Sequence, residues 1–75
     1  MIFVYSKDNC PWCVKAKELL TAKGLEYTEF KFGEDFDADG LRSLLGPDRK
    51  LTVPQVFFDD ELVGGYEDLE KRLAE

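Results

Sequence analysis

Both cysteines of the chain lie in one short motif, Cys10-Pro11-Trp12-Cys13. The sequence changes to helical spacing at Cys10, and Pro11 suits the first position of a helix, where its missing N–H group costs nothing. A thiol at a helix N-terminus faces unpaired N–H groups and the positive end of the helix dipole, which stabilise a thiolate. The i, i+3 spacing puts both sulfurs on one side of the first turn, close enough for a disulfide. The motif therefore predicts thiol–disulfide exchange.

The two sulfurs are expected to have different roles in this chemistry. Cys10 would attack a disulfide and form a mixed disulfide, and Cys13, one turn further along and more buried, would resolve it. Lys7 could add positive charge near Cys10. A static disulfide is the structural alternative, but a loop this short constrains the unfolded chain little, and nothing in the sequence indicates an oxidising compartment.

The composition excludes several other classes of site. The chain has no His, so Ser-His and Cys-His nucleophile pairs are excluded, and two Cys cannot complete a four-thiolate zinc site. We therefore predict no metal site. No GxxxxGK[ST] or GxGxxG loop is present for binding phosphates. The formal net charge of -6 argues against a nucleic-acid binder, which needs a basic face.

The apolar runs are too short for a membrane span, which needs about 20 residues. The first residues, Met1-Ile2-Phe3-Val4-Tyr5, lack the charged start and the cleavage site of a signal peptide. We therefore expect a cytoplasmic protein that binds neither nucleic acid nor membrane.

The hydrophobic pattern predicts one domain over residues 1–75 with the element order βαβαββα. Strands are expected at 1–5, 27–32, 55–58 and 61–64, and helices from 10 to a stop at Gly24, over 38–45 and over 67–74. The first βαβ unit should be a right-handed parallel crossover and the later hairpin must be antiparallel, which gives a mixed four-stranded sheet. The first strand is predicted to be central because it is the most apolar.

Some finer expectations concern single positions. Residues 6–9 are expected to form a polar loop, and Lys17 is expected to lie in solvent. Asp37 is a candidate cap for the second helix. Three leucines are assigned to the buried side of that helix, namely Leu41, Leu44 and Leu45.

Three separated motifs resemble those of the glutaredoxin family, most closely its small bacterial and phage members. They are Cys10-Pro11-Trp12-Cys13, Thr52-Val53-Pro54 and Gly64-Gly65-Tyr66-Glu67-Asp68-Leu69. The resemblance covers nearly the whole chain and implies an α/β, thioredoxin-like fold with sheet order 2-1-3-4, three flanking helices and a monomeric state. It also implies a cis peptide bond before Pro54, which would expose the Val53 backbone to an extended cysteinyl peptide. Without the cysteine motif, the segment around Pro54 would be interpreted as an ordinary turn.

By resemblance, glutathione is the reducing co-substrate and no cofactor is tightly bound. The glycine carboxylate of glutathione maps onto Lys7, and its peptide backbone maps onto Val53, with Trp12 beside it. The γ-glutamyl end maps onto the N-terminus of the last helix, where N–H groups near Glu67 and the Asp68 carboxylate can meet a carboxylate and an ammonium.

The resemblance gives the other motif residues a place around the same groove. Its remaining lining residues are Thr52, Pro54 and Tyr66, with structural roles for Pro11, Gly64 and Gly65 and a carboxylate partner in Lys50 or Arg49. Two residues depart from the family pattern. Many dithiol relatives carry Tyr at the position of Trp12, and Glu67 stands where small polar residues or Asp are common, so its charge could weaken affinity for an anionic ligand.

Three functions remain open at this stage. The first is a glutathione-dependent enzyme that reduces protein disulfides and glutathione mixed disulfides. The second is a hydrogen donor for ribonucleotide reductase that is recycled by thioredoxin reductase. The third is a dimer that bridges a glutathione-ligated [2Fe–2S] cluster, which the stiffening Pro11 and the competing Cys13 disfavour.

Overall fold

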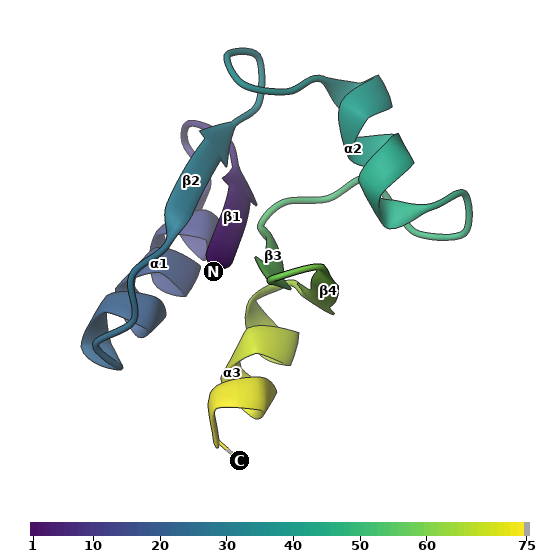
Figure 1. Ribbon diagram of the computed structural model, residues 1–75. Helices are drawn as coiled ribbons and strands as arrows, with labels where there is room; N and C mark the ends of the chain where they lie inside the picture. Colours follow the sequence, from purple (N-terminus) through teal and green to yellow (C-terminus); the bar gives the residue numbers. More distant parts are fainter. Residues whose placement is uncertain (75) are drawn as a thin grey trace.

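The computed structural model describes residues 1–74, which form a mixed sheet with helices on both faces (Figure 1). The elements in chain order are β1 (Ile2–Ser6), α1 (Pro11–Ala22), β2 (Thr28–Lys31), α2 (Ala38–Leu45), β3 (Gln55–Phe58), β4 (Glu61–Gly64) and α3 (Tyr66–Ala74). The order βαβαββα is therefore confirmed. None of the helices within residues 1–74 is long and apolar enough to cross a membrane.

The sheet has the strand order β2-β1-β3-β4. β1 is parallel to β2 and antiparallel to β3, and β3 is antiparallel to β4. The predicted topology is thus confirmed, with β1 between two neighbours. Because β1 and β2 are parallel, their C-terminal ends lie at the same edge of the sheet. The loop of residues 7–10, which leads into α1, begins at this edge.

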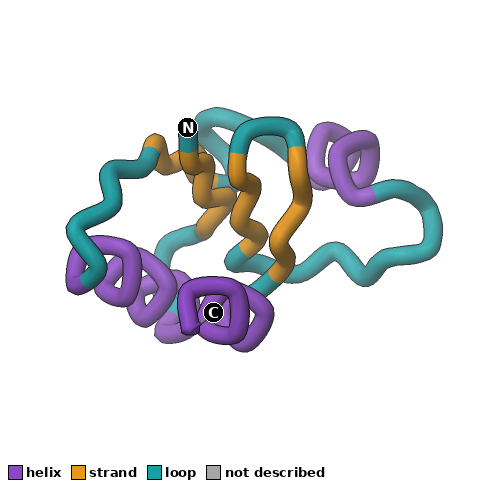
Figure 2. Tube along the Cα trace, turned by 60° about the horizontal axis from the view of Figure 1, so that its bottom comes forward, coloured by secondary structure: helices purple, strands orange, loops and turns teal. Residues whose placement is uncertain are grey.

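Each face of the sheet has its own apolar cluster, because successive strand residues point to opposite sides. Under α1 and α3, Val4 and Val56 pack against residues that are fully buried, namely Ala16, Leu20 and Leu69. Under α2, Phe57 packs with Leu41 and Leu45, and the half-buried rings of Phe3 and Tyr5 join them. Figure 2 shows α1 and α3 together on one side of the strands and α2 on the other.

Several local signals have the predicted effect. Pro11 is the first residue of α1, and Gly24 follows the helix with a left-handed φ of 73°. The Asp37 side chain caps α2 by accepting a hydrogen bond of 2.8 Å from the Gly40 N–H. These signals fix where the helices begin and end.

Other expectations are wrong in detail. Ser6 belongs to β1 and is fully buried, because its hydroxyl finds a carboxylate partner across the sheet. β2 stops at Lys31, so Phe32 makes only an isolated bridge to Phe36 and its side chain is exposed. α3 begins at Tyr66, one residue earlier than predicted.

The buried side of α2 is also narrower than predicted. Leu44 is 44% exposed, whereas Leu41 and Leu45 are buried. A helix of eight residues that lies on a sheet buries one stripe, and the i, i+4 pair Leu41 and Leu45 fills it.

Candidate functional site

The two cysteines form a disulfide across the first turn of α1, with their Cα atoms 5.2 Å apart. Cys10 is the N-cap residue, and its sulfur accepts a hydrogen bond of 3.2 Å from the Cys13 N–H. This is the position where the side chains of Ser, Thr, Asp and Asn commonly satisfy the free N–H groups of a helix. A thiolate is a stronger acceptor than a thiol, so this geometry favours an anion at Cys10 once the disulfide is reduced.

The two sulfurs differ in access and in neighbours. Cys10 is 7% exposed and Cys13 is 1% exposed, in line with the expectation that Cys13 is more buried. The Val53 carbonyl oxygen lies 3.9 Å from the Cys10 sulfur. The peptide bond between Val53 and Pro54 is cis, as the resemblance implied. The segment before β3 therefore lies beside the sulfur that is better placed to meet a substrate.

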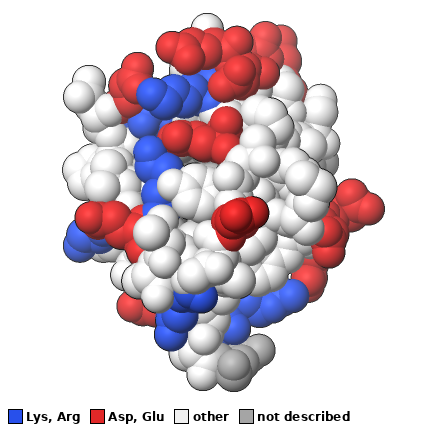
Figure 3. Space-filling model, turned by 60° about the vertical axis from the view of Figure 1, so that its left-hand side comes forward, with Lys and Arg blue, Asp and Glu red and all other residues white. Residues whose placement is uncertain are grey.

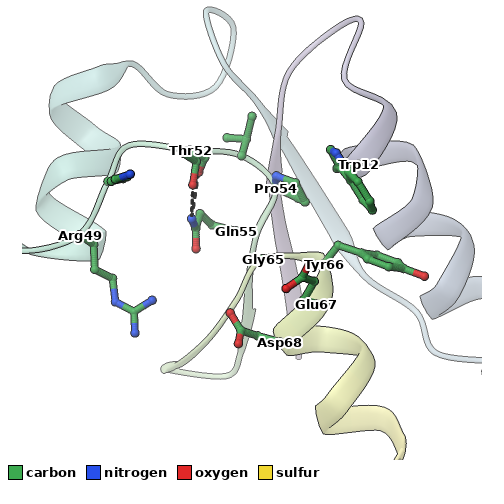
Figure 4. A pocket seen from close by; sticks show the side chains of 11 residues that line it. Trp12, Arg49, Thr52, Pro54, Gln55, Gly65, Tyr66, Glu67 and Asp68 are labelled. Carbon is green, nitrogen blue, oxygen red and sulfur yellow. Dashed lines mark hydrogen bonds between the residues drawn. The ribbon is translucent and has the colours of Figure 1, made fainter.

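A cavity of about 390 Å³ opens beside this segment (Figure 4). Its lining residues are Trp12, Arg49, Lys50, Thr52, Val53, Pro54, Gln55, Gly65, Tyr66, Glu67 and Asp68. The structure thus brings together all of the predicted glutathione contacts except Lys7. They come from the start of α1, the segment before β3 and the start of α3.

An aromatic wall bounds the cavity on the side of α1. Trp12 is 52% exposed, and its ring centroid lies 5.6 Å from that of Tyr66. The ammonium of Lys15 lies 4.7 Å from the centre of the indole ring, in a cation–π contact. Burial raises the pKa of the Tyr66 hydroxyl, and the neighbouring Glu70 carboxylate raises it further, so Tyr66 stays neutral. A planar, uncharged surface of this kind suits a peptide backbone that lies along it.

The charged residues of the cavity are separated by sign. Arg49 and Lys50 lie in the segment before β3, whereas Glu67 and Asp68 lie in the first turn of α3. Figure 4 shows the Arg49 and Asp68 side chains on different sides of the cavity. A ligand that carries both carboxylate and ammonium groups would find partners of opposite charge there.

Gly64 makes room for the Asp68 carboxylate. Gly64 has a φ of +123°, and a Cβ built on it would lie 2.9 Å from the carboxylate carbon of Asp68. A Cβ at Gly65, by contrast, would reach ordinary contact distance, 3.6 Å, from the Pro54 carbonyl oxygen. The close packing at Gly64 explains why β4 ends in a residue without a side chain.

Lys7 is placed differently from the other predicted contacts. It borders a hollow shared with Cys10 and Cys13 and a second, more apolar one shared with Thr52 and Val53. Lys7 does not line the cavity of Trp12 and Asp68, but Thr52 and Val53 line both that cavity and the hollow of Lys7.

Sequence reasoning missed Gln55. This buried side chain lines the cavity, and its amide nitrogen donates to the Thr52 carbonyl oxygen at 2.9 Å and to the Thr52 hydroxyl at 3.2 Å. It therefore holds the segment that contains Val53 and Pro54. The sequence did offer a signal for this role, because Gln55 is a polar residue at the start of an otherwise apolar strand.

The arrangement can now be compared with known proteins. The glutaredoxin family model matches residues 2–63 of the sequence. The chain belongs to the glutaredoxin family. Together with a disulfide in CxxC spacing at a helix N-terminus, membership of this family supports a thiol–disulfide oxidoreductase.

Individual relatives agree with this assignment. Glutaredoxin 3 of Escherichia coli is 36% identical over 66 residues, which cover 88% of this chain and 77% of that protein. Hybrid peroxiredoxin hyPrx5 of Haemophilus influenzae is 42% identical over 73 residues, but the match spans 97% of this chain and only 29% of that protein. Among solved structures, a buckwheat glutaredoxin–glutathione complex superposes with a TM-score of 0.82 at 25% identity, covering 97% of this chain and 67% of that one.

Proposed function

We propose that the protein is a glutathione-dependent oxidoreductase that reduces protein disulfides and glutathione mixed disulfides. It acts as a cytoplasmic monomer, with Cys10 and Cys13 as its reactive groups. The observation that carries this proposal is the disulfide at the N-terminus of α1, next to a cavity with basic and acidic groups on different walls. Protein substrates are disulfide-containing or glutathionylated proteins, and ribonucleotide reductase is proposed among them from the family resemblance.

The proposed reaction begins at the sulfur of Cys10. Its thiolate attacks a substrate disulfide, so that one substrate sulfur leaves as a thiolate and the other is bonded to Cys10. The Cys13 thiolate then attacks the Cys10 sulfur, the bond to the substrate breaks, and the Cys10–Cys13 disulfide forms. Two glutathione thiols restore the dithiol by the same two exchanges in reverse and leave as glutathione disulfide.

The cavity supports glutathione as the reductant. Glutathione carries two carboxylates and one ammonium, and the cavity offers Arg49 and Lys50 on one side and Asp68 with the first turn of α3 on another. The backbone N–H groups at this helix start can bind a carboxylate, and the Asp68 carboxylate can bind the ammonium. Val53 presents its backbone next to the Cys10 sulfur, where the central cysteinyl residue of glutathione would lie.

Cysteine variants test the chemistry. Cys10→Ser should abolish reduction of a glutathionylated peptide and of a protein disulfide, because the nucleophile is missing. Cys13→Ser should retain reduction of the glutathionylated peptide, which needs only Cys10, and lose the dithiol route to protein disulfides. Steady-state assays with both substrates measure this, and full turnover by Cys10→Ser would refute the proposed nucleophile.

A second experiment identifies the electron donor. The oxidised protein is incubated with glutathione or with NADPH and thioredoxin reductase, and the recovery of thiols is followed. We expect recovery with glutathione, and we expect Asp68→Asn to raise KM for glutathione about tenfold, since it removes a charged contact worth ~1.4 kcal/mol. Asp60→Asn, an exposed residue in the hairpin turn, is the matched control and should leave KM unchanged. If thiols recovered only with NADPH and thioredoxin reductase, the electron donor would be that reductase and the proposed glutathione dependence would be wrong.

A further inference from the structure

A charged hollow of about 570 Å³ lies on another side of the active-site turn, and both cysteines border it. Its charged residues are Lys7 and Asp8 from the loop after β1, Lys17 from α1, and Glu29 and Lys31 from β2. Three cations and two anions give this hollow a net charge of about +1 at neutral pH. Figure 3 shows basic and acidic side chains interleaved on the side of the molecule that α1 and β2 form.

Glu29 is the centre of a hydrogen-bonded network in this hollow. One carboxylate oxygen, Oε2, accepts from the Ser6 hydroxyl at 2.5 Å and from the Lys17 ammonium at 2.8 Å. Ser6 is fully buried, and the side chains of Lys17 and Glu29 are about three-quarters buried. Lys17 was predicted to lie in solvent, and this pair corrects that prediction. A partly buried ion pair of this kind interacts more strongly than a fully exposed pair.

The network is linked to the second cysteine through α1. Lys17 follows Cys13 by four residues, so both side chains project from the same face of α1. Glu29 pairs with Val4 across the parallel strands, and Val4 packs under α1, so Glu29 points to the same face of the sheet. The pair therefore stands between β2 and the helical turn that carries Cys13.

Glu29 is ionised at neutral pH. Burial acts to raise its pKa, but the hydrogen bonds from Lys17 and Ser6 and the charges of Lys17 and Lys31 outweigh burial and lower it. Lys31 is itself paired with Asp8 at 3.2 Å, and this hydrogen bond and charge raise the pKa of Lys31, which stays protonated. Cys13 thus shares this hollow with two ion pairs, Lys17–Glu29 and Lys31–Asp8.

We propose that Lys17 and Glu29 are positioning residues that set the thiolate population of Cys13 and, through it, the rate of the resolving step. This inference rests on the proposed dithiol function. In that step the Cys13 thiol loses its proton to solvent, and its sulfur bonds to Cys10. The bond between Cys10 and the substrate sulfur breaks, and the substrate leaves as a thiolate. The Lys17 charge favours the Cys13 anion and the Glu29 charge opposes it, so the balance between the two charges sets how much thiolate is present.

An electrostatic role predicts shifts of opposite sign for the two partners. Glu29→Gln keeps an oxygen that can accept from Ser6 and Lys17 but removes the negative charge, so the Cys13 thiolate becomes more stable. Lys17→Met keeps most of the aliphatic stem and removes the positive charge, so the thiolate becomes less stable. A purely structural role predicts instead that both variants weaken the site in the same direction. The double variant carries no net charge change and should resemble the parent.

The test measures the Cys13 thiolate in a Cys10→Ser background by its ultraviolet absorbance as a function of pH. We expect Glu29→Gln to lower the midpoint by about half a unit and Lys17→Met to raise it by a similar amount, as charges several ångströms away do in a partly buried site. This corresponds to about a threefold change in thiolate at a fixed pH. Glu18→Gln and Lys71→Met change exposed residues outside the hollow and serve as matched controls with no shift.

A second readout uses the intact cysteine pair, in case the background variant folds poorly. At a pH above the Cys13 midpoint, where the reduced protein carries the Cys13 thiolate, the equilibrium between the Cys10–Cys13 disulfide and glutathione should move about threefold toward the dithiol in Glu29→Gln and about threefold toward the disulfide in Lys17→Met. Shifts of the same sign, or none, would overturn the inference and leave the proposed function standing. If the proposed function itself were wrong, Cys10→Ser would show normal turnover, so the two failures can be told apart.

Discussion

At the scale of single residues, the cysteine motif is the part of the site that the sequence predicts best. Cys10, Pro11 and Cys13 act through local effects, namely a helix cap, a fixed φ and an i, i+3 spacing, so neighbouring residues are enough to recognise them. The Lys17–Glu29 pair is different. Its members lie 12 residues apart on a helix and a strand, and only the packing of α1 on β2 brings them together.

Gly64 is another residue whose role depends on the folded chain. We expect Gly64→Ala to lower the free energy of unfolding by ~2 kcal/mol, because a Cβ at φ +123° is strained and overlaps the Asp68 carboxylate. The displaced carboxylate should also raise KM for glutathione. Urea unfolding and steady-state kinetics measure the two effects.

Gly33 provides the matched control for this substitution. It also has a left-handed φ, +87°, but a Cβ there would meet no atom within 4 Å. Gly33→Ala should therefore cost ~1 kcal/mol of stability from the backbone alone and leave KM unchanged. An unchanged KM in Gly64→Ala as well would show that the position of Asp68 does not matter for binding.

At the scale of elements, the sequence predicts which helices and strands exist, and errors concentrate at their ends. Ser6 was assigned to a loop because it is polar, yet it extends β1 once Glu29 supplies a hydrogen bond from the next strand. The end of β2 was placed too late because Phe32 continues the alternation of Phe30, although its ring lies outside the ladder and packs edge-on against Phe36. Both ends depend on partners that are distant in the sequence.

The buried stripe of α2 gives a prediction at this scale. Leu41→Ala should lower the free energy of unfolding by ~3 kcal/mol, because Leu41 is only 3% exposed and lies in the cluster under α2. Leu44→Ala should cost less than about 1 kcal/mol, since nearly half of this residue is already exposed to solvent. Chemical denaturation of the two variants makes the comparison. Equal losses would contradict the observed orientation of α2.

At the scale of the whole molecule, the family resemblance predicted the strand order and the cis Val53–Pro54 bond, which no local pattern could establish. Its assignment of Lys7 to the glycine carboxylate of glutathione stays a prediction. Lys7 follows β1 and shares one hollow with both cysteines and another with Thr52 and Val53, which also line the cavity of Trp12 and Asp68. A family motif predicts where in the chain a residue lies. The direction of a long side chain such as that of Lys7 depends also on the residues packed around it, which the motif does not specify.

The dependence of stability on pH should report the Lys17–Glu29 pair. The pKa of Glu29 is lower in the folded protein than its ordinary value of 4.5. A group with a lowered folded pKa adds stability above its unfolded pKa, and this contribution is lost as the pH falls through the folded value. Between about pH 5 and pH 3, the parent should therefore lose more unfolding free energy than Glu29→Gln. Urea titrations over this range measure the difference, and parallel curves would mean that Glu29 gains nothing from its partners.

The central claim is that the N–H groups which open α1 hold the Cys10 sulfur as an anion in the reduced protein. The most direct measurement is the rate of Cys10 alkylation by iodoacetamide as a function of pH, in Cys13→Ser to avoid reoxidation. The account predicts a midpoint well below the ordinary thiol value of about 8.5, so that alkylation is already near its maximum at neutral pH. A rate that keeps rising until about pH 8.5, as for an ordinary exposed thiol, would contradict it.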